Sequence, residues 1–440
     1  MHRRDLLRAG ALGMAGLTLP DLLAAREEAG EVTRDTSVIL LYLHGGPSHL
    51  ETYDLKVEAP SSYRSIYAPI STNVPGIELC ELFPLQAKLA DKLAIVRSCH
   101  HEMSSHSDGG ITVLTGREPS VADPTSQSKS EHPDFGNITG MMRPRPKMPA
   151  YVALPRAPYM TRPAYIGVQH RALDAGDPSA ANYKSPIQVS SGLQGERLSD
   201  RRGLLRTLDT MRRGFDDRQM SVDKFRDLAF NILASPDVSR AFDVSQESED
   251  LKLAYGKNSW GQSALLARRL AEAGVGVVTM FMNTPLVGPD WTNWDDHIQN
   301  AGRPGHFGTY MSRRLPYLDQ CLSALITDIY QRDLDKRIMV VVMGEFGRTP
   351  RLSENTNGVG RDHWPQAYSV LFSGGGLRTG QVVGATNSKG EYPTQRPTTP
   401  DDVLATIYQH LGISPQLEIL RNGRPIRLLE RGTPIDELVG

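Results

Sequence analysis

The sequence predicts an α/β protein built around a mainly parallel β-sheet with helices on its faces. Short apolar runs at residues 37–43, 276–282 and 338–343 are rich in β-branched side chains, as is typical of strands buried on both faces. A helical pattern at residues 262–273 ends at Gly274 and leads directly into the second of these runs. Strands that alternate with helices favour a parallel sheet. We therefore expect a single α/β domain.

Other stretches of the chain indicate elements of the same two kinds. Apolar runs that predict shorter strands lie at residues 93–97, 150–154 and 368–372. Apolar residues have helical spacing at residues 82–90, 204–233, 318–330 and 401–411.

Turn and helix-breaking residues set the expected boundaries. Pro316 suits the first turn of the helix at 318–330, and Gly412 suits the end of the helix at 401–411. Residues 120–149 are rich in Pro, Ser and charged side chains, which predicts a loop, and residues 155–199 are irregular. The expected domain spans residues 36–440 and contains an irregular and helical excursion at about 120–260.

Composition excludes several classes of protein. The 440 residues carry 49 Lys and Arg against 50 Asp and Glu, a net charge of −1, so nothing predicts a nucleic-acid partner. The three cysteines, Cys80, Cys99 and Cys321, are far apart and lack metal-site spacing, although one disulfide would be compatible with them. No segment after the N-terminus is long and apolar enough to predict a membrane helix.

The first 25 residues have the features of an export signal. Arg3 and Arg4 precede a mild apolar segment at residues 9–19, and Ala24 and Ala25 suit a processing site. The arginine pair resembles a twin-arginine signal, and an ordinary secretory signal is the alternative. We expect the mature protein to be exported, in the periplasm or elsewhere outside the cytoplasm.

Side chains that bind metals follow several of the predicted strands. His44 and Glu345 come just after two buried strands, and ligands of open α/β sheets bind at the carboxyl ends of strands. Mixed imidazole and carboxylate ligands suit Zn, Mn or Fe, here one or two divalent ions. Hydrogen bonding or helix capping is the alternative for any one of these residues. The full set of candidate ligands is His44, Asp295, His297, Glu345 and His363.

Three further residues are candidates for catalysis. His101 and His106 lie in a polar stretch and suit extra ligands or general acid–base groups. Arg348 suits a bidentate clamp on a phosphate or sulfate, with a salt bridge to a nearby acid as the alternative. The sequence lacks a dinucleotide-binding glycine motif after any strand, a P-loop, and the Gly-x-Ser-x-Gly of α/β-hydrolases.

Several motifs occur in an order that resembles one bacterial family. They are the export signal, LHGGPSHLETYD, HSDGG, LTGREP, WDDH, MGEFGRTP, GRDHWP and SGGGLRTGQVVGATN. The chain is similar to the family known as domain of unknown function 1501, over nearly its whole mature length. That family is grouped with the alkaline-phosphatase-like superfamily, which includes sulfatases and phosphodiesterases. The resemblance implies a three-layer alkaline-phosphatase-like sandwich.

The resemblance also implies roles for single residues. His44 stands where the superfamily ends its first strand with a metal-binding Asp, and Asp295, His297 and His363 resemble other ligands. Counting back from the Leu-Thr-Gly at 114–116 places His106 where sulfatases carry their modified Cys. Glu345-Phe346 stands where the superfamily has a later Asp-His pair, which loses one nitrogen ligand. The resemblance therefore keeps some ligands but lacks the usual Cys, Ser or Thr nucleophile.

Two functions are compatible with these residues. The first is an exported metal-dependent hydrolase of phosphate or sulfate esters, in which a coordinated water replaces the missing nucleophile. Its substrate would be a small anionic ester or a sulfated or phosphorylated glycan. The second is a catalytically inactive member of the family that binds a carbohydrate or a cell-surface partner.

Overall fold

The protein is described by a computed structural model, which covers residues 35–145, 148–187, 230–233, 235–286, 293–300, 303–304, 306–356, 358–421 and 423–440. Residues 36–440 form one compact unit. The predicted export signal lies outside the described residues, and so does most of the helix predicted at 204–233.

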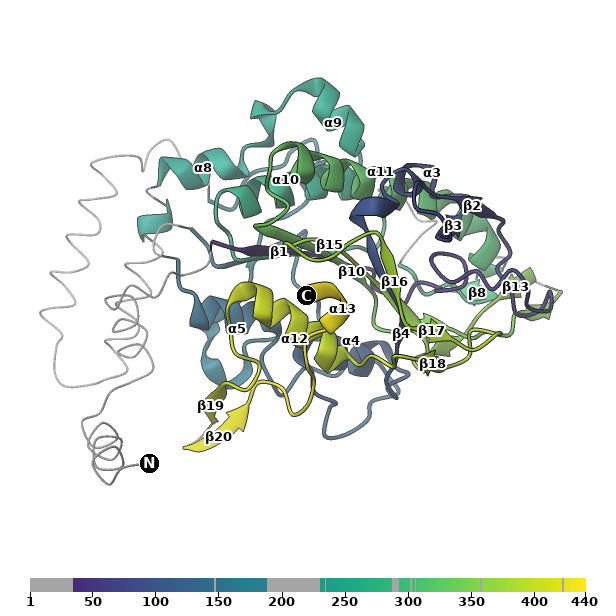
Figure 1. The fold of residues 1–440 in the computed structure, drawn as a ribbon. Helices are drawn as coiled ribbons and strands as arrows, with labels where there is room; N and C mark the ends of the chain where they lie inside the picture. Colours follow the sequence, from purple (N-terminus) through teal and green to yellow (C-terminus); the bar gives the residue numbers. More distant parts are fainter. Residues whose placement is uncertain are drawn as a thin grey trace, which may run out of the picture. The chain divides into compact units, whose positions relative to one another are not determined.

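An eight-stranded sheet runs through this unit (Figure 1). Every neighbouring pair of strands is parallel except the two pairs made by β15, so the prediction of a mainly parallel sheet is confirmed. In spatial order the strands are β16 (Gln381–Val383), β4 (Ala94–Cys99), β15 (Tyr368–Gly374), β10 (Ile338–Met343), β1 (Ser37–Tyr42), β7 (Val277–Phe281), β5 (Tyr151–Leu154) and β6 (Leu173–Asp174).

The central strand β1 is buried on both faces because helices cover both sides of the sheet. Ile39 and Leu41 belong to one hydrophobic core, whereas Val38 and Leu40 belong to a second core on the opposite face. Side chains of a strand point alternately to the two faces, so a run without polar residues is what two cores require.

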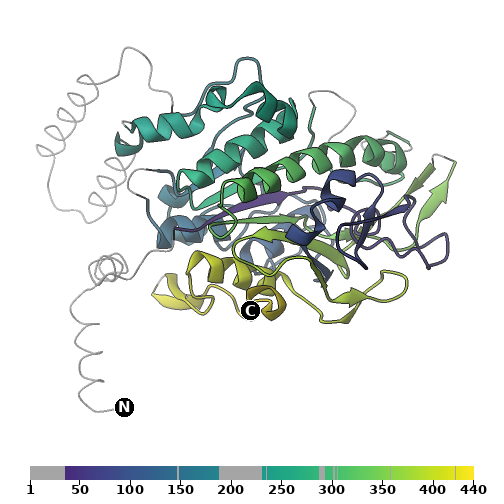
Figure 2. The same ribbon diagram turned by 45° about the horizontal axis from the view of Figure 1, so that its top comes forward.

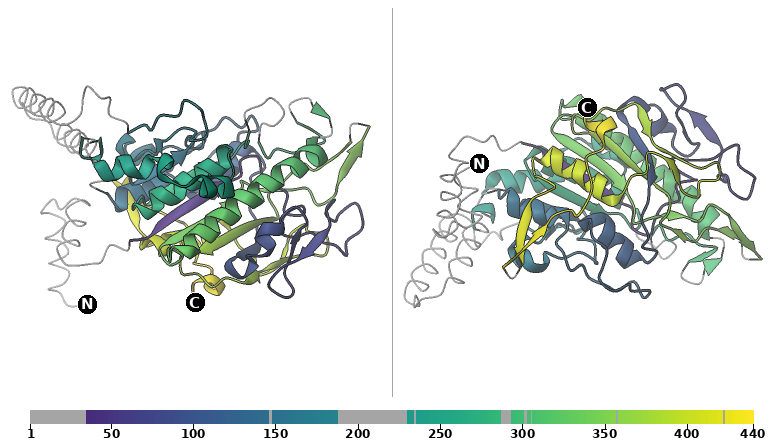
Figure 3. Two further views of the ribbon diagram at one scale, coloured as in Figure 1. Left: turned by 90° about the horizontal axis from the view of Figure 1, so that it is seen from above. Right: turned by 60° about the horizontal axis from the view of Figure 1, so that its bottom comes forward.

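The helices form a layer on each face of the sheet (Figures 1 and 3). One layer contains α3 (Pro84–Ala87), α8 (Pro236–Phe242), α9 (Glu249–Tyr255), α10 (Ser259–Glu272) and α11 (His306–Gln331). The other contains α4 (His106–Thr115), α5 (Phe135–Met142), α12 (Pro400–Leu411) and α13 (Asp436–Val439). Within the described residues, no helix is both long enough and apolar enough to cross a membrane.

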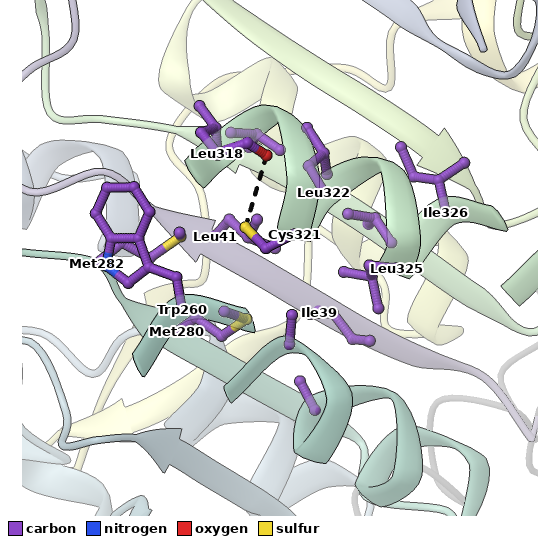
Figure 4. Packing of buried hydrophobic residues seen from close by; sticks show 14 of the residues in the cluster. Ile39, Leu41, Trp260, Met280, Met282, Leu318, Cys321, Leu322, Leu325 and Ile326 are labelled. Atoms are coloured by element: carbon purple, nitrogen blue, oxygen red, sulfur yellow. Dashed lines mark hydrogen bonds between the residues drawn. The ribbon is translucent and has the colours of Figure 1, made fainter. Parts of the chain in front are cut away.

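Helix α11 lies beside α10 over the sheet and buries the predicted apolar stripe (Figure 2). Leu318, Cys321 and Leu322 of this stripe pack against Ile39 and other residues of the first core (Figure 4). The predicted start of the helix was wrong, because α11 begins at His306 and Pro316 lies inside it. Pro316 is exposed, so water can reach the carbonyl that a proline leaves without an intrahelical partner.

Two helices were not expected from the sequence. Helix α5 lies within residues 120–149, which were predicted to be a loop. Helix α4 begins at His106, in the segment for which only a polar stretch had been described. The three cysteines are all buried and free, so no disulfide forms among them.

Small two-stranded ladders complete the edges of the unit. Two of them, β11 (Gly347–Arg348) with β14 (His363–Trp364) and β12 (Ser353–Asn355) with β13 (Gly358–Gly360), lie in the connection between β10 and β15. Another, β19 (Glu418–Arg421) with β20 (Arg424–Arg427), forms a hairpin near the C-terminus (Figure 1).

Candidate metal centre

Three central strands deliver polar side chains to one edge of the sheet because they are parallel and in register. Tyr42 of β1 pairs with Phe281 of β7 on one side and with Met343 of β10 on the other. Residues at equal distances beyond these partners therefore leave the sheet together, at its carboxyl edge. His44, Asn283 and Glu345 each lie two residues after one of these three paired residues.

Helix α4 brings His106 to the same edge. Strand β4 runs in the same direction as β10, so the loop after Cys99 reaches the carboxyl edge and α4 begins there. The Ser105 side chain caps the helix by accepting the backbone N–H of Asp108. Gly109 allows close packing, because a Cβ at this position would lie 3.2 Å from the Cβ of Glu345.

The connection between β10 and β15 brings His363 into the centre. Because β15 is antiparallel to β10, it begins at the edge where β10 ends, and the connecting residues remain at that edge. Within the connection, the ladder of β11 and β14 pairs Arg348 with His363. The backbone ladder therefore fixes these two side chains next to each other.

The segment 293–297 packs directly against the end of β1. The backbone N–H of Trp294 donates to the carbonyl oxygen of His44 at 2.8 Å. Gly45 has a φ of +118°, and a Cβ there would overlap the backbone nitrogens of Trp294 and Asp295. Only glycine suits both this conformation and this close approach, which together place the Asp295 carboxylate beside the sheet edge.

His44 presents a free nitrogen to the centre. Its Nδ1 donates to Oδ1 of Asn283 at 3.0 Å, which leaves Nε2 as the nitrogen with a lone pair. Burial lowers the pKa of His44, so the ring is neutral. Nε2 is buried and has no hydrogen-bond partner, and the same is true of Oε2 of Glu345. The other oxygen of Glu345 accepts the backbone N–H of Gly45 at 2.7 Å.

His297 and His363 have the same orientation. Nδ1 of His297 faces Oδ1 of Asp362 at 2.7 Å, and Nδ1 of His363 donates to the carbonyl oxygen of Ser104 at 2.8 Å. Their Nε2 atoms lie 3.2 Å apart and face Oδ1 of Asp295 at 2.8 and 2.9 Å. A metal-binding histidine is usually held in this way, by an oxygen acceptor at its other ring nitrogen.

His106 lies between the two carboxylates. Its Nδ1 is 2.7 Å from Oε1 of Glu345, and its Nε2 is 3.3 Å from Oδ2 of Asp295. Burial alone would lower the pKa of His106, but hydrogen bonds and charge from Asp295 and Glu345 raise it to about 9. When no metal ion is bound, the His106 ring is therefore a cation, and its charge balances those of the two carboxylates.

Both carboxylates are held in the ionised form. Burial raises the pKa of Asp295, but the hydrogen bonds of His106, His297 and His363 outweigh it and move the pKa below its ordinary range. For Glu345, burial is likewise outweighed by His106, and the pKa is lowered.

The Arg348 guanidinium is fully buried and its donors are directed at protein acceptors. Nη2 is 2.7 Å from Oδ1 of Asp295 and also donates to the carbonyl oxygens of Gly45 and Trp294. Nε donates to the carbonyl oxygen of Gly46 at 2.8 Å. This environment matches the salt bridge that was the alternative to the anion clamp.

His101 lies beside the centre but has no nitrogen to offer. Nε2 donates to the backbone carbonyl of Glu345 at 2.6 Å, and Nδ1 accepts the backbone N–H of Met103 at 3.0 Å. Burial lowers the pKa of His101 to about 4, so the ring is neutral. These contacts differ from the expected ligand or acid–base group, because both nitrogens are bonded to the backbone.

The arrangement fits a divalent cation. Two overlapping sets of ligand atoms lie within 4.8 Å of one another: His44, His106 and Glu345 in one, and His106, Asp295 and His363 in the other. The unpartnered His44 Nε2 and Glu345 Oε2 are lone-pair atoms whose burial is costly without a positive partner. Ionised carboxylates with the neutral imidazoles of His44 and His363 are a donor set expected for Zn, Mn or Fe, and a bound ion would displace a proton from His106.

The structure thus brings most of the predicted residues together and adds roles for two more: one that sequence reasoning missed, and Asp362, which precedes the predicted ligand His363 in the GRDHWP motif. His44, His106, Asp295, His297, Glu345, His363 and Arg348 meet at one edge of the sheet. The two additional residues are Asn283 and Asp362, which hold the Nδ1 atoms of His44 and His297. A signal for Asn283 was available, since it directly follows a predicted strand, as do His44 and Glu345.

Comparison with known families identifies the chain. Residues 35–439 match the model of the family described as "Protein of unknown function (DUF1501)". The chain belongs to this family. The resemblance inferred from the motifs is therefore confirmed over the whole described unit. No curated protein matches the sequence.

Several solved structures have a low similarity to this family member. A lipoteichoic acid synthase from Listeria monocytogenes is 12% identical to this chain. The match covers 92% of this chain and 76% of the synthase chain, with a TM-score of 0.39. A sulfatase from Pseudoalteromonas is 12% identical, with coverage of 90% and 70% and a TM-score of 0.36. A phosphonate monoester hydrolase from Silicibacter pomeroyi is 12% identical, with coverage of 86% and 73% and a TM-score of 0.35.

Proposed function

We propose that this protein is an exported metal-dependent hydrolase of phosphate or sulfate esters. The observation that carries the proposal is the shared orientation of His44, His297 and His363. Each holds Nδ1 against an oxygen acceptor. Nε2 of His297 and of His363 faces Asp295, and Nε2 of His44 is buried without a partner in the ligand group that contains Glu345. An imidazole nitrogen beside an ionised carboxylate is an arrangement that a divalent cation stabilises, because the cation can take the place of a proton between them.

One ion would be held by His44, His106 and Glu345, and a second by Asp295 and His363 with His297 beside them. His106 links the two positions, because each of its nitrogens faces one of the carboxylates. A bound divalent ion would polarise an ester oxygen and lower the pKa of a water molecule. The chain itself keeps Glu345 and Asp295 ionised, which favours a divalent ion over a monovalent one.

The remaining predicted residues act as positioning groups in this proposal. Arg348 contacts both Asp295 and the turn at Gly45 and Gly46. In this proposal it therefore positions the Asp295 carboxylate and does not bind the substrate. His101 ties the backbone of Glu345 to the loop that precedes α4. The substrate would enter over His297 and His363, whose side chains are 26% and 24% exposed.

The proposed location and partners follow from the same site and from the N-terminus. The arginine pair Arg3 and Arg4 supports export, and folded proteins with bound metals are typical cargo of that route. The substrate would be a small anionic ester or a sulfated or phosphorylated glycan. The alternative, an inactive binding protein, is favoured by two observations: a histidine, and not a hydroxyl or thiol, stands at position 106, and Phe346 stands where a ligand is expected.

Turnover tests the proposal. We expect the purified protein to hydrolyse at least one of 4-nitrophenyl phosphate, bis(4-nitrophenyl) phosphate and 4-nitrophenyl sulfate. Chelation should abolish this activity and added Zn²⁺, Mn²⁺ or Fe²⁺ should restore it. His44→Ala should lower kcat/KM at least about 100-fold, since it removes a ligand. His170→Ala, in η3 (Val168–His170) and outside the centre, is the control.

Two results would contradict this account. Turnover that survives complete chelation would exclude the metal-dependent mechanism. Tight binding of a sulfated polysaccharide, with no turnover of any of the three esters, would favour the inactive binding protein.

A further inference from the structure

A cavity of about 420 Å³ adjoins the candidate metal centre. It lies at the carboxyl ends of β5 and β7, beside the first turns of α10, and it shares a wall with the centre. Asn283, in this wall, accepts the hydrogen bond of His44 Nδ1. The ring of Phe281, also in the wall, lies 4.7 Å from the His44 ring. A molecule in the cavity would therefore be one side chain away from the proposed ion.

The cavity is lined mainly by apolar side chains from the two strands. Leu154 of β5 and Met280 and Phe281 of β7 line it, and Met282 continues this wall past the end of β7. Figure 4 shows Met280 and Met282 beside Trp260. Arg156 and Asp177 also line the cavity, and the Arg156 guanidinium lies 5.9 Å from the centroid of the Phe281 ring, so the apolar wall faces a ligand that needs few charges of its own.

Two buried hydrogen-bond donors in the lining have no partner. Nε1 of Trp260 and Oγ of Ser263 are unpartnered, and each residue is only 3% exposed. Trp260 is held in place by stacking on Trp294, with ring centroids 5.5 Å apart and an angle of 8°. Buried donors are usually satisfied in native proteins, so this pair suits acceptor atoms of a ligand.

We propose that this cavity binds the alcohol portion of the ester, and that this portion is a largely apolar ring carrying an acceptor oxygen. The proposal rests on the hydrolase function proposed above. A cavity of this volume falls within the range of small-molecule sites and accommodates a one-ring or two-ring group. Aromatic and aliphatic walls would pack on the faces of the ring, and Trp260 and Ser263 would donate to its oxygen.

Calorimetric titration with 4-nitrophenol tests the cavity without any need for turnover. The wild-type protein should bind this phenol, and Ser263→Ala should weaken binding three- to tenfold by removing one donor. Ser263→Leu should weaken it more than tenfold by filling space. The matched control is Ser323→Ala, because Ser323 is also a buried helical serine without a partner but does not line the cavity.

Kinetics separate a failure of this inference from a failure of the proposed function. If the protein is a hydrolase, the ratio of kcat/KM for 4-nitrophenyl phosphate to that for methyl phosphate should fall at least tenfold in Ser263→Leu. The ratio should be unchanged in Ser323→Ala. No phenol binding, or equal binding by wild type and both Ser263 variants, would overturn the inference. Binding without turnover of any ester would instead overturn only the hydrolase function.

Discussion

Asp295→Asn should weaken metal binding strongly and destabilise the fold at the same time. The Asp295 carboxylate faces His106, His297 and His363 and pairs with the fully buried Arg348. Loss of its charge leaves a buried guanidinium without a counterion, which lowers the free energy of unfolding by about 3–5 kcal/mol. Metal affinity should fall at least about 100-fold, since a ligand and its alignment are both lost.

The measurement is thermal unfolding with and without added metal, together with a metal titration. Asp362→Asn is the matched control, because its carboxylate also contacts His297 but is 65% exposed. That variant should change stability by less than about 1 kcal/mol, as is usual for exposed charge pairs. Equal effects of the two substitutions would show that burial and the pair with Arg348 do not decide the outcome.

Asp296→Asn is expected to have the second large effect, although Asp296 does not face the ions. Both oxygens of Asp296 accept hydrogen bonds from Arg314, at 2.6 and 3.1 Å, and both side chains are fully buried. Breaking this pair by removing one charge should cost about 3–5 kcal/mol of unfolding free energy. Because Asp296 lies between Asp295 and His297, the same change should also weaken metal binding.

A double substitution distinguishes the effect of losing one charge of the Asp296–Arg314 pair from the effect of removing both charges. Asp296→Leu with Arg314→Met removes both charges together with the buried Nε of Arg314, which has no hydrogen-bond partner. Denaturant unfolding should find the double variant more stable than Asp296→Asn. Asp237→Asn, in an exposed pair with Arg240, is the control and should change stability by less than about 0.5 kcal/mol. A double variant less stable than the single one would contradict this explanation.

The strands were predictable because a strand that is buried on both faces consists mainly of apolar residues. Residues 38–41 and 338–343 are all apolar, since both strands are covered by helices on both faces. The antiparallel direction of β15 was not predictable, because a long connection after β10 is compatible with either direction. Helix α4 was missed because it contains Gly109 and Gly110 and is buried nearly all round, so its apolar residues show no amphipathic period.

The candidate site was predictable in its residues but not in their roles. His44 and Glu345 could be selected because they lie one or two residues beyond buried strands. His101 and His106 lie in the same polar stretch. Ser105 and Asp108 have the spacing of a helix N-cap there, but that spacing does not show that His106 faces the carboxylates. The roles depend on which ring nitrogen is already bonded, and that depends on contacts between residues far apart in the chain.

Anomalous X-ray diffraction from crystals grown with Zn²⁺ or Mn²⁺ tests the central claim most directly. We expect an anomalous peak in contact with His44 Nε2 and Glu345, and a second, if two ions bind, beside Asp295 and His363. His106 should lie within reach of both positions. Crystals at saturating metal that show no peak at this edge of the sheet, or only peaks on the surface elsewhere, would contradict the account.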